Sequence, residues 1–161
     1  MKISIGILEN HLQSAAQELN KLLADEFLLY TQTRNYHWNI EGSNFTEMHL
    51  FYEKQFTELD DVMDEVAERI RMIGHYTEAR LGDYLKLTQL VEQPYTNDQQ
   101  VQLQYLLDSQ EAIIRNLRRL IAIFADEYKD IGSSDFATQL LSRHEKMAWM
   151  IRAHLNPKIS K

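Results

Sequence analysis

The chain of 161 residues contains no cysteine. This absence excludes disulfides, thiolate metal ligands and cysteine nucleophiles, so any metal ligand must offer nitrogen or oxygen, and it fits a reducing compartment. No apolar run approaches the roughly 20 residues that cross a bilayer. The N-terminal MKISIGILEN reaches Glu9 before a signal-peptide core develops. We therefore expect a soluble, cytoplasmic protein with no membrane contact.

Glycine and proline are also scarce, with five and two residues respectively. So few breaks indicate a small number of long helices. A chain of this length buries roughly 70% of its unfolded surface, so we expect one domain spanning residues 1–161. The formal net charge of -7 makes the average surface a poor partner for nucleic acid, whose binding would require a local basic patch.

Apolar residues recur at three- and four-residue steps along the first half of the chain, which is the period of amphipathic helices. The first expected helix runs over about residues 8–36 and ends in the turn NIEGSN. The second starts near Thr46 and ends before Gly74. Ser43 and Asn44 are its candidate N-terminal caps.

The second half of the chain continues the helical pattern. A short helix over residues 79–87 lies in the long connection, and residues 96–98 cap a third long helix that extends to Phe124. A fourth begins between Asp130 and Asp135 and is stopped by Pro157. We see no strand pattern, so the predicted fold is all-α, a four-helix bundle with a short extra helix between the second and third long helices.

Two pairs of possible metal ligands lie on the second helix. His49 and Glu53 are four residues apart, as are Asp64 and Glu68, so each pair shares one helix face and could chelate a metal. Such pairs are weak signals by themselves. The alternative for Asp64 and Glu68 is a solvated face stabilised by charged neighbours on the same helix.

Helix geometry indicates that one chain cannot complete such a site. His49 and Asp64 are 15 residues apart, which places them ~22 Å apart along the axis but only ~60° apart around it. Two antiparallel copies related by a two-fold axis near Thr57 would place His49 and Glu53 of one chain beside Asp64 and Glu68 of the other. We therefore predict two equivalent sites at a dimer interface.

His37 could join this site, because the short turn NIEGSN folds the end of the first helix back toward the second. Two imidazoles with three carboxylates suit Fe(II), Mn(II) or Zn(II) better than Cu(I). The carboxylates favour iron for redox work, because they stabilise Fe(III). The Glu-x-x-His pairs of bundle-core di-iron proteins are absent, which argues against a di-iron centre inside one bundle.

Several motifs together resemble one family. They are YHWN at 36–39, G-x-x-F at 42–45, MHLFYE at 48–53, MDEVAERI at 63–70 and HEKMAWMIRAHL at 144–155. In order and spacing this chain resembles the Dps family, the ferritin-like DNA-binding proteins from starved cells, also called mini-ferritins. The resemblance covers almost the whole chain and implies a ferritin-like four-helix bundle.

The resemblance also implies a function. Dps proteins carry a ferroxidase centre between two-fold related subunits, which corresponds here to His37, His49 and Glu53 with Asp64 and Glu68 from the partner. The third position is Glu where many relatives have Asp. The implied activity is iron storage: Fe(II) is oxidised, with hydrogen peroxide preferred to dioxygen, and ferric iron mineralises inside a hollow dodecameric shell, which protects against oxidative stress.

Other positions acquire roles only through the resemblance. Asp130 and Asp135 match acidic positions of the pores that admit iron, and a third such position falls on Gln139. Trp38 and Tyr52 would sit beside the centre, where aromatics are thought to take up oxidising equivalents. Ordinary interface packing is the alternative for both aromatics.

The remaining histidines carry less signal. His144 lies on the apolar stripe of the last helix, which favours a hydrogen-bonded core histidine. His11, His75 and His154 have no acidic partner at a suitable spacing, and we assign them no role.

Two alternative functions stay open. One is DNA binding and nucleoid protection, which the few lysines near the termini, Lys2, Lys158 and Lys161, support poorly. The other is a helical shell protein whose metal sites are inert. Iron oxidation measured against buffer would separate this last reading from a ferroxidase.

Overall fold

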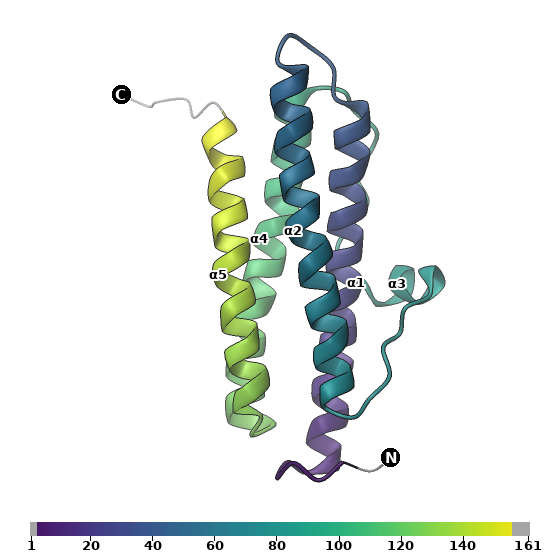
Figure 1. The fold of residues 1–161 in the computed structure, drawn as a ribbon, viewed down its shortest axis with the longest axis vertical. Coiled ribbons are helices and arrows are strands. Elements are labelled where there is room, and N and C mark those ends of the chain that lie inside the picture. Colours follow the sequence, from purple (N-terminus) through teal and green to yellow (C-terminus); the bar gives the residue numbers. More distant parts are fainter. Residues whose placement is uncertain (1–2, 156–161) are drawn as a thin grey trace.

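The computed structural model of the chain, which describes residues 3–155, consists of four long helices packed in a bundle and a short helix beside them (Figure 1). The elements in chain order are α1 (Glu9–Asn39), α2 (Phe45–Met72), α3 (Leu81–Leu87), α4 (Gln99–Ala122), the π-helical turn η1 (Ile123–Glu127) and α5 (Ile131–His154). No strand occurs within the described residues.

The topology contains one long crossover. α1 packs antiparallel to α2, and α4 packs antiparallel to α5. The connection between them carries α3 and returns along the outside of the bundle, so α2 and α4 run in the same direction (Figure 1). One long crossover is the connectivity of ferritin-like bundles. The predicted all-α bundle with a short helix in this connection is confirmed.

The predicted helix ends differ from the observed ones by up to three residues. α1 continues to Asn39 rather than residue 36, and α3 starts at Leu81 rather than residue 79, because Arg80 before it is extended. α5 ends at His154. Pro157, the predicted stop, lies outside the described residues.

The structure forms a cap in the predicted segment 96–98 and another at Asp130, within the range predicted for the start of the last helix, but not at Asn44. Asp98 accepts a hydrogen bond from the Val101 amide, and Asp130 caps α5 by accepting from the Ser133 amide. Asn44 occupies the first position before α2, but its side chain donates to Gln99 Oε1 at 2.7 Å instead of capping the helix. That prediction was wrong, because the amide instead links the α1–α2 turn to α4.

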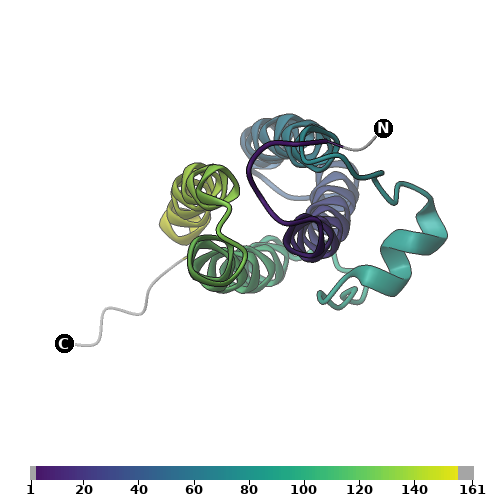
Figure 2. The same cartoon turned by 90° about the horizontal axis from the view of Figure 1, so that it is seen from below.

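The C-terminus of α2 ends in a glycine turn. Gly74 has φ +89°, and the amides of Gly74 and His75 bond to the carbonyls of Arg71 and Ile70. A Cβ at Gly74 would lie 2.9 Å from the Ile3 side chain. The N-terminal segment therefore packs across this end of the bundle (Figure 2).

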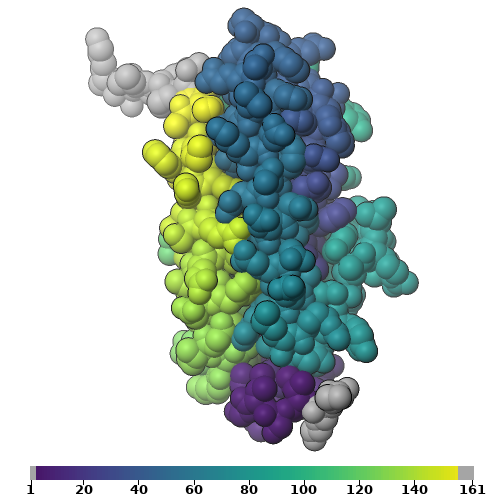
Figure 3. Space-filling model, viewed as in Figure 1, coloured from purple at the N-terminus to yellow at the C-terminus, as the bar shows by residue number. Residues whose placement is uncertain are grey.

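The core lies along the bundle axis and draws apolar side chains from all four long helices. Each such side chain contributes roughly 1.5–3 kcal/mol when fully buried. Figure 3 shows the side chains of α2 and α5 meeting along one face of the molecule. Fully buried members include Leu19, Leu22, Leu59, Val62, Leu103, Ile113, Leu140 and Ala148. Within residues 3–155, no helix has the length and apolar character needed to cross a bilayer.

Candidate metal centre

His37 and His49 meet where α1 turns into α2. Their rings stack with centroids 3.6 Å apart and an angle of 21° between the ring planes. Each ring also bonds to the backbone of the other residue: His37 Nδ1 lies 2.9 Å from the His49 carbonyl oxygen, and His49 Nδ1 lies 2.8 Å from the His37 carbonyl oxygen. The proximity predicted from the turn NIEGSN is confirmed.

These reciprocal bonds determine which nitrogen of each ring stays available. A carbonyl oxygen only accepts, so both Nδ1 atoms carry the proton and donate it. Each Nε2 then holds its lone pair, which is the form in which a histidine binds a metal. A backbone carbonyl bonded to the second nitrogen is also the arrangement that orients metal-binding imidazoles.

Aromatic side chains and one arginine surround the histidine pair. Phe45 stacks on His49 with centroids 5.1 Å apart, and Phe56 contacts His37 edge-on at 5.1 Å. The Arg34 guanidinium lies 4.2 Å from the centre of the Phe56 ring and also faces Trp38 and Tyr30. Among the described residues, Arg34 has no acidic partner. The positive charge of Arg34 therefore lies against the ring of Phe56, which in turn contacts His37.

The three carboxylates predicted as ligands all lie on the surface of α2. Glu53, Asp64 and Glu68 are exposed, and within residues 3–155 none of their carboxylates forms an ion pair. The α2 helix is uninterrupted from Phe45 to Met72. Glu53 therefore lies one turn from His49, whereas Asp64 and Glu68 lie several turns further along the helix.

One chain holds an incomplete set of ligands. In the part of the chain that the structure describes, no group of three or more histidine or acidic side chains is close enough to hold a metal ion. The structure brings His37 to His49, leaves Glu53 one helical turn along α2 from His49, and keeps Asp64 and Glu68 several turns away. Their joint action as metal ligands stays a prediction.

Comparison with known proteins places the chain in a family. The family model described as a ferritin-like domain matches residues 16–158. DNA protection during starvation protein 2 of Bacillus anthracis is 33% identical over 86% of this chain and 94% of its own length. The corresponding protein of Porphyromonas gingivalis is 34% identical over 92% and 93%. The chain belongs to the Dps family.

Solved structures agree. The Dps protein from Vibrio cholerae O1, described as a member of the ferritin-like diiron-carboxylate superfamily, has 32% identity and a TM-score of 0.89, covering 94% of this chain and 95% of its own. DpsC from Streptomyces coelicolor has 25% identity and a TM-score of 0.92, covering 100% and 95%. The predicted Dps resemblance and ferritin-like fold are confirmed.

The two Dps pore candidates differ in their surroundings. Asp130 is only 2% exposed, and its carboxylate is bonded by Arg69, at 3.1 Å, and by Ser133. This placement argues against a pore role for Asp130, because its charge is compensated inside its own subunit. Asp135 is exposed and accepts a hydrogen bond from Gln139 at 2.9 Å, and its pore role stays a prediction.

The two aromatics suggested as neighbours of the Dps centre also diverge. Trp38 is 65% exposed beside Arg34. Tyr52 is fully buried, donates its hydroxyl to Gln102 Oε1 at 3.1 Å, and has its pKa raised by burial. Of these two aromatics, Trp38 has its ring at the surface and Tyr52 has its ring in the core.

The other histidines of this Dps chain follow the sequence reading in one case. His144 is a fully buried, hydrogen-bonded core histidine, as predicted. His75 lies 3.6 Å from Glu9, and His11 bonds to the Tyr128 carbonyl. These acidic and carbonyl partners come from segments distant in the sequence, so spacing along one helix could not identify them.

Sequence reasoning missed Arg34 and Phe56 as parts of the site. A signal for them was present, because Arg34 precedes His37 by three residues and Phe56 follows His49 by seven, and both spacings keep residues on one helix face. Neither arginine nor phenylalanine is a metal-ligating residue type, so a pattern of metal ligands does not identify these two positions.

Proposed function

We propose that this protein is a ferroxidase and iron-storage mini-ferritin that oxidises Fe(II) at sites between two-fold related subunits. His37, His49 and Glu53 of one subunit bind the iron together with Asp64 and Glu68 of the partner subunit. Hydrogen peroxide is the preferred oxidant, and the ferric product mineralises inside a closed shell. Consuming peroxide in this way protects the cell against oxidative stress.

The observation that carries the proposal is the reciprocal bonding of His37 and His49. It commits both Nδ1 atoms to carbonyl oxygens and leaves both Nε2 lone pairs for metal. Nitrogen donors beside carboxylates form a site that accepts both Fe(II) and Fe(III). No cysteine competes for softer metals.

The arrangement of α2 supports a shared site. Glu53, Asp64 and Glu68 lie on one face of the helix without an ion-pair partner among residues 3–155, and a two-fold axis would place Asp64 and Glu68 of each chain opposite the histidines of the other. Large apolar side chains of α2 are also exposed, among them Leu50 at 48% and Phe45 at 44%. Such groups favour burial against a second copy of the chain.

The proposed reaction uses one peroxide for each pair of irons. Two Fe(II) ions each lose one electron, the O–O bond of hydrogen peroxide breaks, and two hydroxide ions form. This two-electron reduction avoids releasing a hydroxyl radical. The protein's part is to hold ligands and to concentrate cations through its negative charge. We propose a dodecameric shell, with Asp135 among the acidic groups along which Fe(II) enters.

An anaerobic Fe(II) titration followed by stoichiometric peroxide or by air tests the activity. We expect rapid ferric absorbance with peroxide, a slower rise with air, and no rate above buffer for the double variant His37→Ala, His49→Ala. An unchanged rate in that variant would favour a helical shell with inert sites.

Subunit mixing tests the shared site. The variants His37→Ala, His49→Ala and Asp64→Ala, Glu68→Ala should each be inactive alone. In a 1:1 reassembled mixture, mixed dimers contain one complete site of two, so about a quarter of the wild-type activity should return. A site confined to one chain predicts no recovery.

DNA protection, the activity in the names of several relatives, is the second candidate. Nothing in the described residues favours it, since Ile3 and Ile7 anchor the N-terminal segment to the core. Lys2, Lys158 and Lys161 lie outside the described residues. Retardation of DNA by the intact oligomer at low salt, lost on replacing Lys158 and Lys161, would support it.

A further inference from the structure

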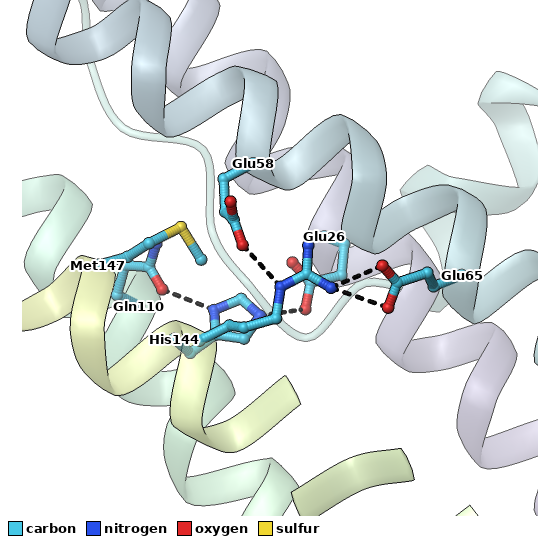
Figure 4. Close-up of polar contacts among 7 residues, drawn as sticks. Glu26, Glu58, Glu65, Gln110, His144 and Met147 are labelled. Atoms are coloured by element: carbon cyan, nitrogen blue, oxygen red, sulfur yellow. Dashed lines mark hydrogen bonds and ion pairs between the residues drawn. The ribbon is translucent and has the colours of Figure 1, made fainter. Parts of the chain in front are cut away.

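A second polar cluster lies in the centre of the bundle, away from the proposed iron site. Glu26 on α1 and His144 on α5 are both fully buried, and Glu26 Oε1 lies 2.9 Å from His144 Nε2 (Figure 4). The contact is poorly aligned for an N–H···O bond, and within the described residues Glu26 Oε2 has no hydrogen-bond partner. A buried carboxyl this sparsely bonded needs a reason.

The neighbours of His144 determine its protonation. Gln110 Nε2 approaches the Met147 sulfur at 3.7 Å, and Gln110 Oε1 lies 2.7 Å from His144 Nδ1. A thioether sulfur only accepts hydrogen bonds, so the amide nitrogen of Gln110 faces it and the amide oxygen faces the ring. His144 Nδ1 therefore carries a proton and donates it to Gln110.

The contact between Glu26 and His144 must then contain one further proton. Without it, two lone pairs would meet at 2.9 Å. With one proton the pair is neutral overall, either as imidazolium with carboxylate or as imidazole with carboxylic acid. Losing it leaves a net negative charge, and adding another leaves a net positive charge. Either change places an uncompensated charge where no water reaches, which is strongly unfavourable.

The charged groups around the pair do not supply an alternative partner. On α2, Glu58 and Glu65 both bond to Arg143, the residue before His144, so these charges are already paired (Figure 4). On α4 the facing group is the uncharged Gln110. On α1, Asp25 is bonded to Thr88 and to the connection backbone, while burial and the neighbouring Glu26 raise the pKa of its carboxyl.

We propose that Glu26 and His144 share one proton and form a pH-sensitive latch that fastens α5 to α1 and α4. The direction of the pH dependence follows from the number of protons that the two side chains hold in each state. In the unfolded chain a glutamate and a histidine have ordinary pKa values of about 4.3 and 6.5. Between these pH values the folded and the unfolded chain both hold one proton on the pair, so the pair stabilises the fold most there. Above about pH 6.5 the folded pair holds the extra proton, and below about pH 4.3 the unfolded chain does. The unfolding constant therefore rises about tenfold per pH unit on either side.

The variant Glu26→Gln isolates this proton. A glutamine amide can donate to His144 Nε2 in nearly the same shape, but the pair then has no proton to exchange. Equilibrium unfolding of the assembled protein is measured at fixed protein concentration from pH 4.5 to 8. We expect the variant to lose stability relative to wild type by about tenfold in the unfolding constant for each unit of falling pH.

The matched control is Glu145→Gln. Glu145 follows His144 on α5 and pairs at the surface with Arg118 of α4. Its curve should run parallel to that of the wild type. Parallel curves for Glu26→Gln would overturn the proposal. If Glu26→Gln does not fold, hydrogen exchange at the imidazole C2 of the wild type decides. His144 should show no inflection between pH 5 and 8, whereas an inflection near its ordinary value would refute the shared proton.

Discussion

The chain contains two places where a histidine meets a polar partner from another helix, and they differ in what occupies the second ring nitrogen. At the α1–α2 turn, His37 and His49 each donate from Nδ1 to a backbone carbonyl, and each Nε2 remains without a partner among the described residues. In the bundle centre, both nitrogens of His144 meet side chains, Gln110 on one side and Glu26 on the other.

This difference separates the two histidines proposed to bind metal from a structural one. A backbone carbonyl orients a ring without supplying charge, so the other nitrogen stays free for a metal. The buried carboxyl of Glu26 instead occupies Nε2 of His144, so this nitrogen is not available to a metal. The residue type is the same in the two places, so the partner of the second nitrogen separates the two roles.

Removing Glu26 from the buried Glu26–His144 pair should have the largest effect on the free energy of unfolding. Glu26→Leu leaves His144 Nε2 without a partner in the core, and breaking a buried pair in this way costs about 3–5 kcal/mol. Denaturant unfolding at fixed protein concentration measures the loss. For Glu145→Gln, whose surface pair contributes only about 0–1 kcal/mol, the change should be small. Equal losses would remove the distinction between buried and surface partners.

Removing the free Nε2 of His37 from the His37–His49 pair should slow iron oxidation more than it destabilises the fold. His37→Gln can keep a hydrogen bond to the His49 carbonyl but lacks the metal-binding nitrogen, so we expect oxidation to slow at least about 100-fold, or about 2.7 kcal/mol. Stopped-flow ferric absorbance measures the rate. His75→Gln, at the opposite end of the bundle, is the matched control and should leave the rate unchanged. A normal rate for His37→Gln would mean that the open nitrogen has no part in the reaction.

The positive charge of Arg34 should weaken iron binding at the proposed site of His37 and His49. With the guanidinium roughly 10 Å from a divalent ion at high effective dielectric, Coulomb repulsion is about 0.8 kcal/mol, so Arg34→Met should tighten anaerobic Fe(II) binding about fourfold. Calorimetric titration at low ionic strength measures this change. The gain should shrink as salt is added. A gain that ignores salt would point to altered packing against Phe56 instead.

The smallest effect on stability should come from the contact between Met147 and Gln110, next to the Glu26–His144 pair. Met147→Leu keeps the volume but removes the sulfur that accepts from Gln110, and we expect a loss of about 0.5 kcal/mol. The unfolding midpoint measures this loss. Met150→Leu, a partly buried methionine one turn further along α5, is the comparison variant. A cost above about 2 kcal/mol would mean that the Gln110 orientation depends on this contact more strongly than its length suggests.

Much of the fold could be read from the sequence because its signals are local. The three- and four-residue apolar period located four helices, the cap at Asp98 fell within the predicted segment 96–98, and the last helix starts within the predicted range of residues 130–135. Asn44 could not be read correctly, because its side chain bonds to Gln99, 55 residues later. Asp130 shows the same limit, since its partner Arg69 comes from another helix.

For the candidate site, the sequence determined which residues share a face of α2 and that one chain cannot bring His49 and Asp64 together, because both follow from the rise of a continuous helix. Only the tertiary structure decided which ring nitrogens are free. That choice depends on carbonyls and side chains from other helices: His37 and His49 exchange backbone bonds, while His144 meets Glu26 from 118 positions earlier. Glu26 itself lies on the apolar stripe between Leu22 and Leu29, so the period indicated its burial but not its partner.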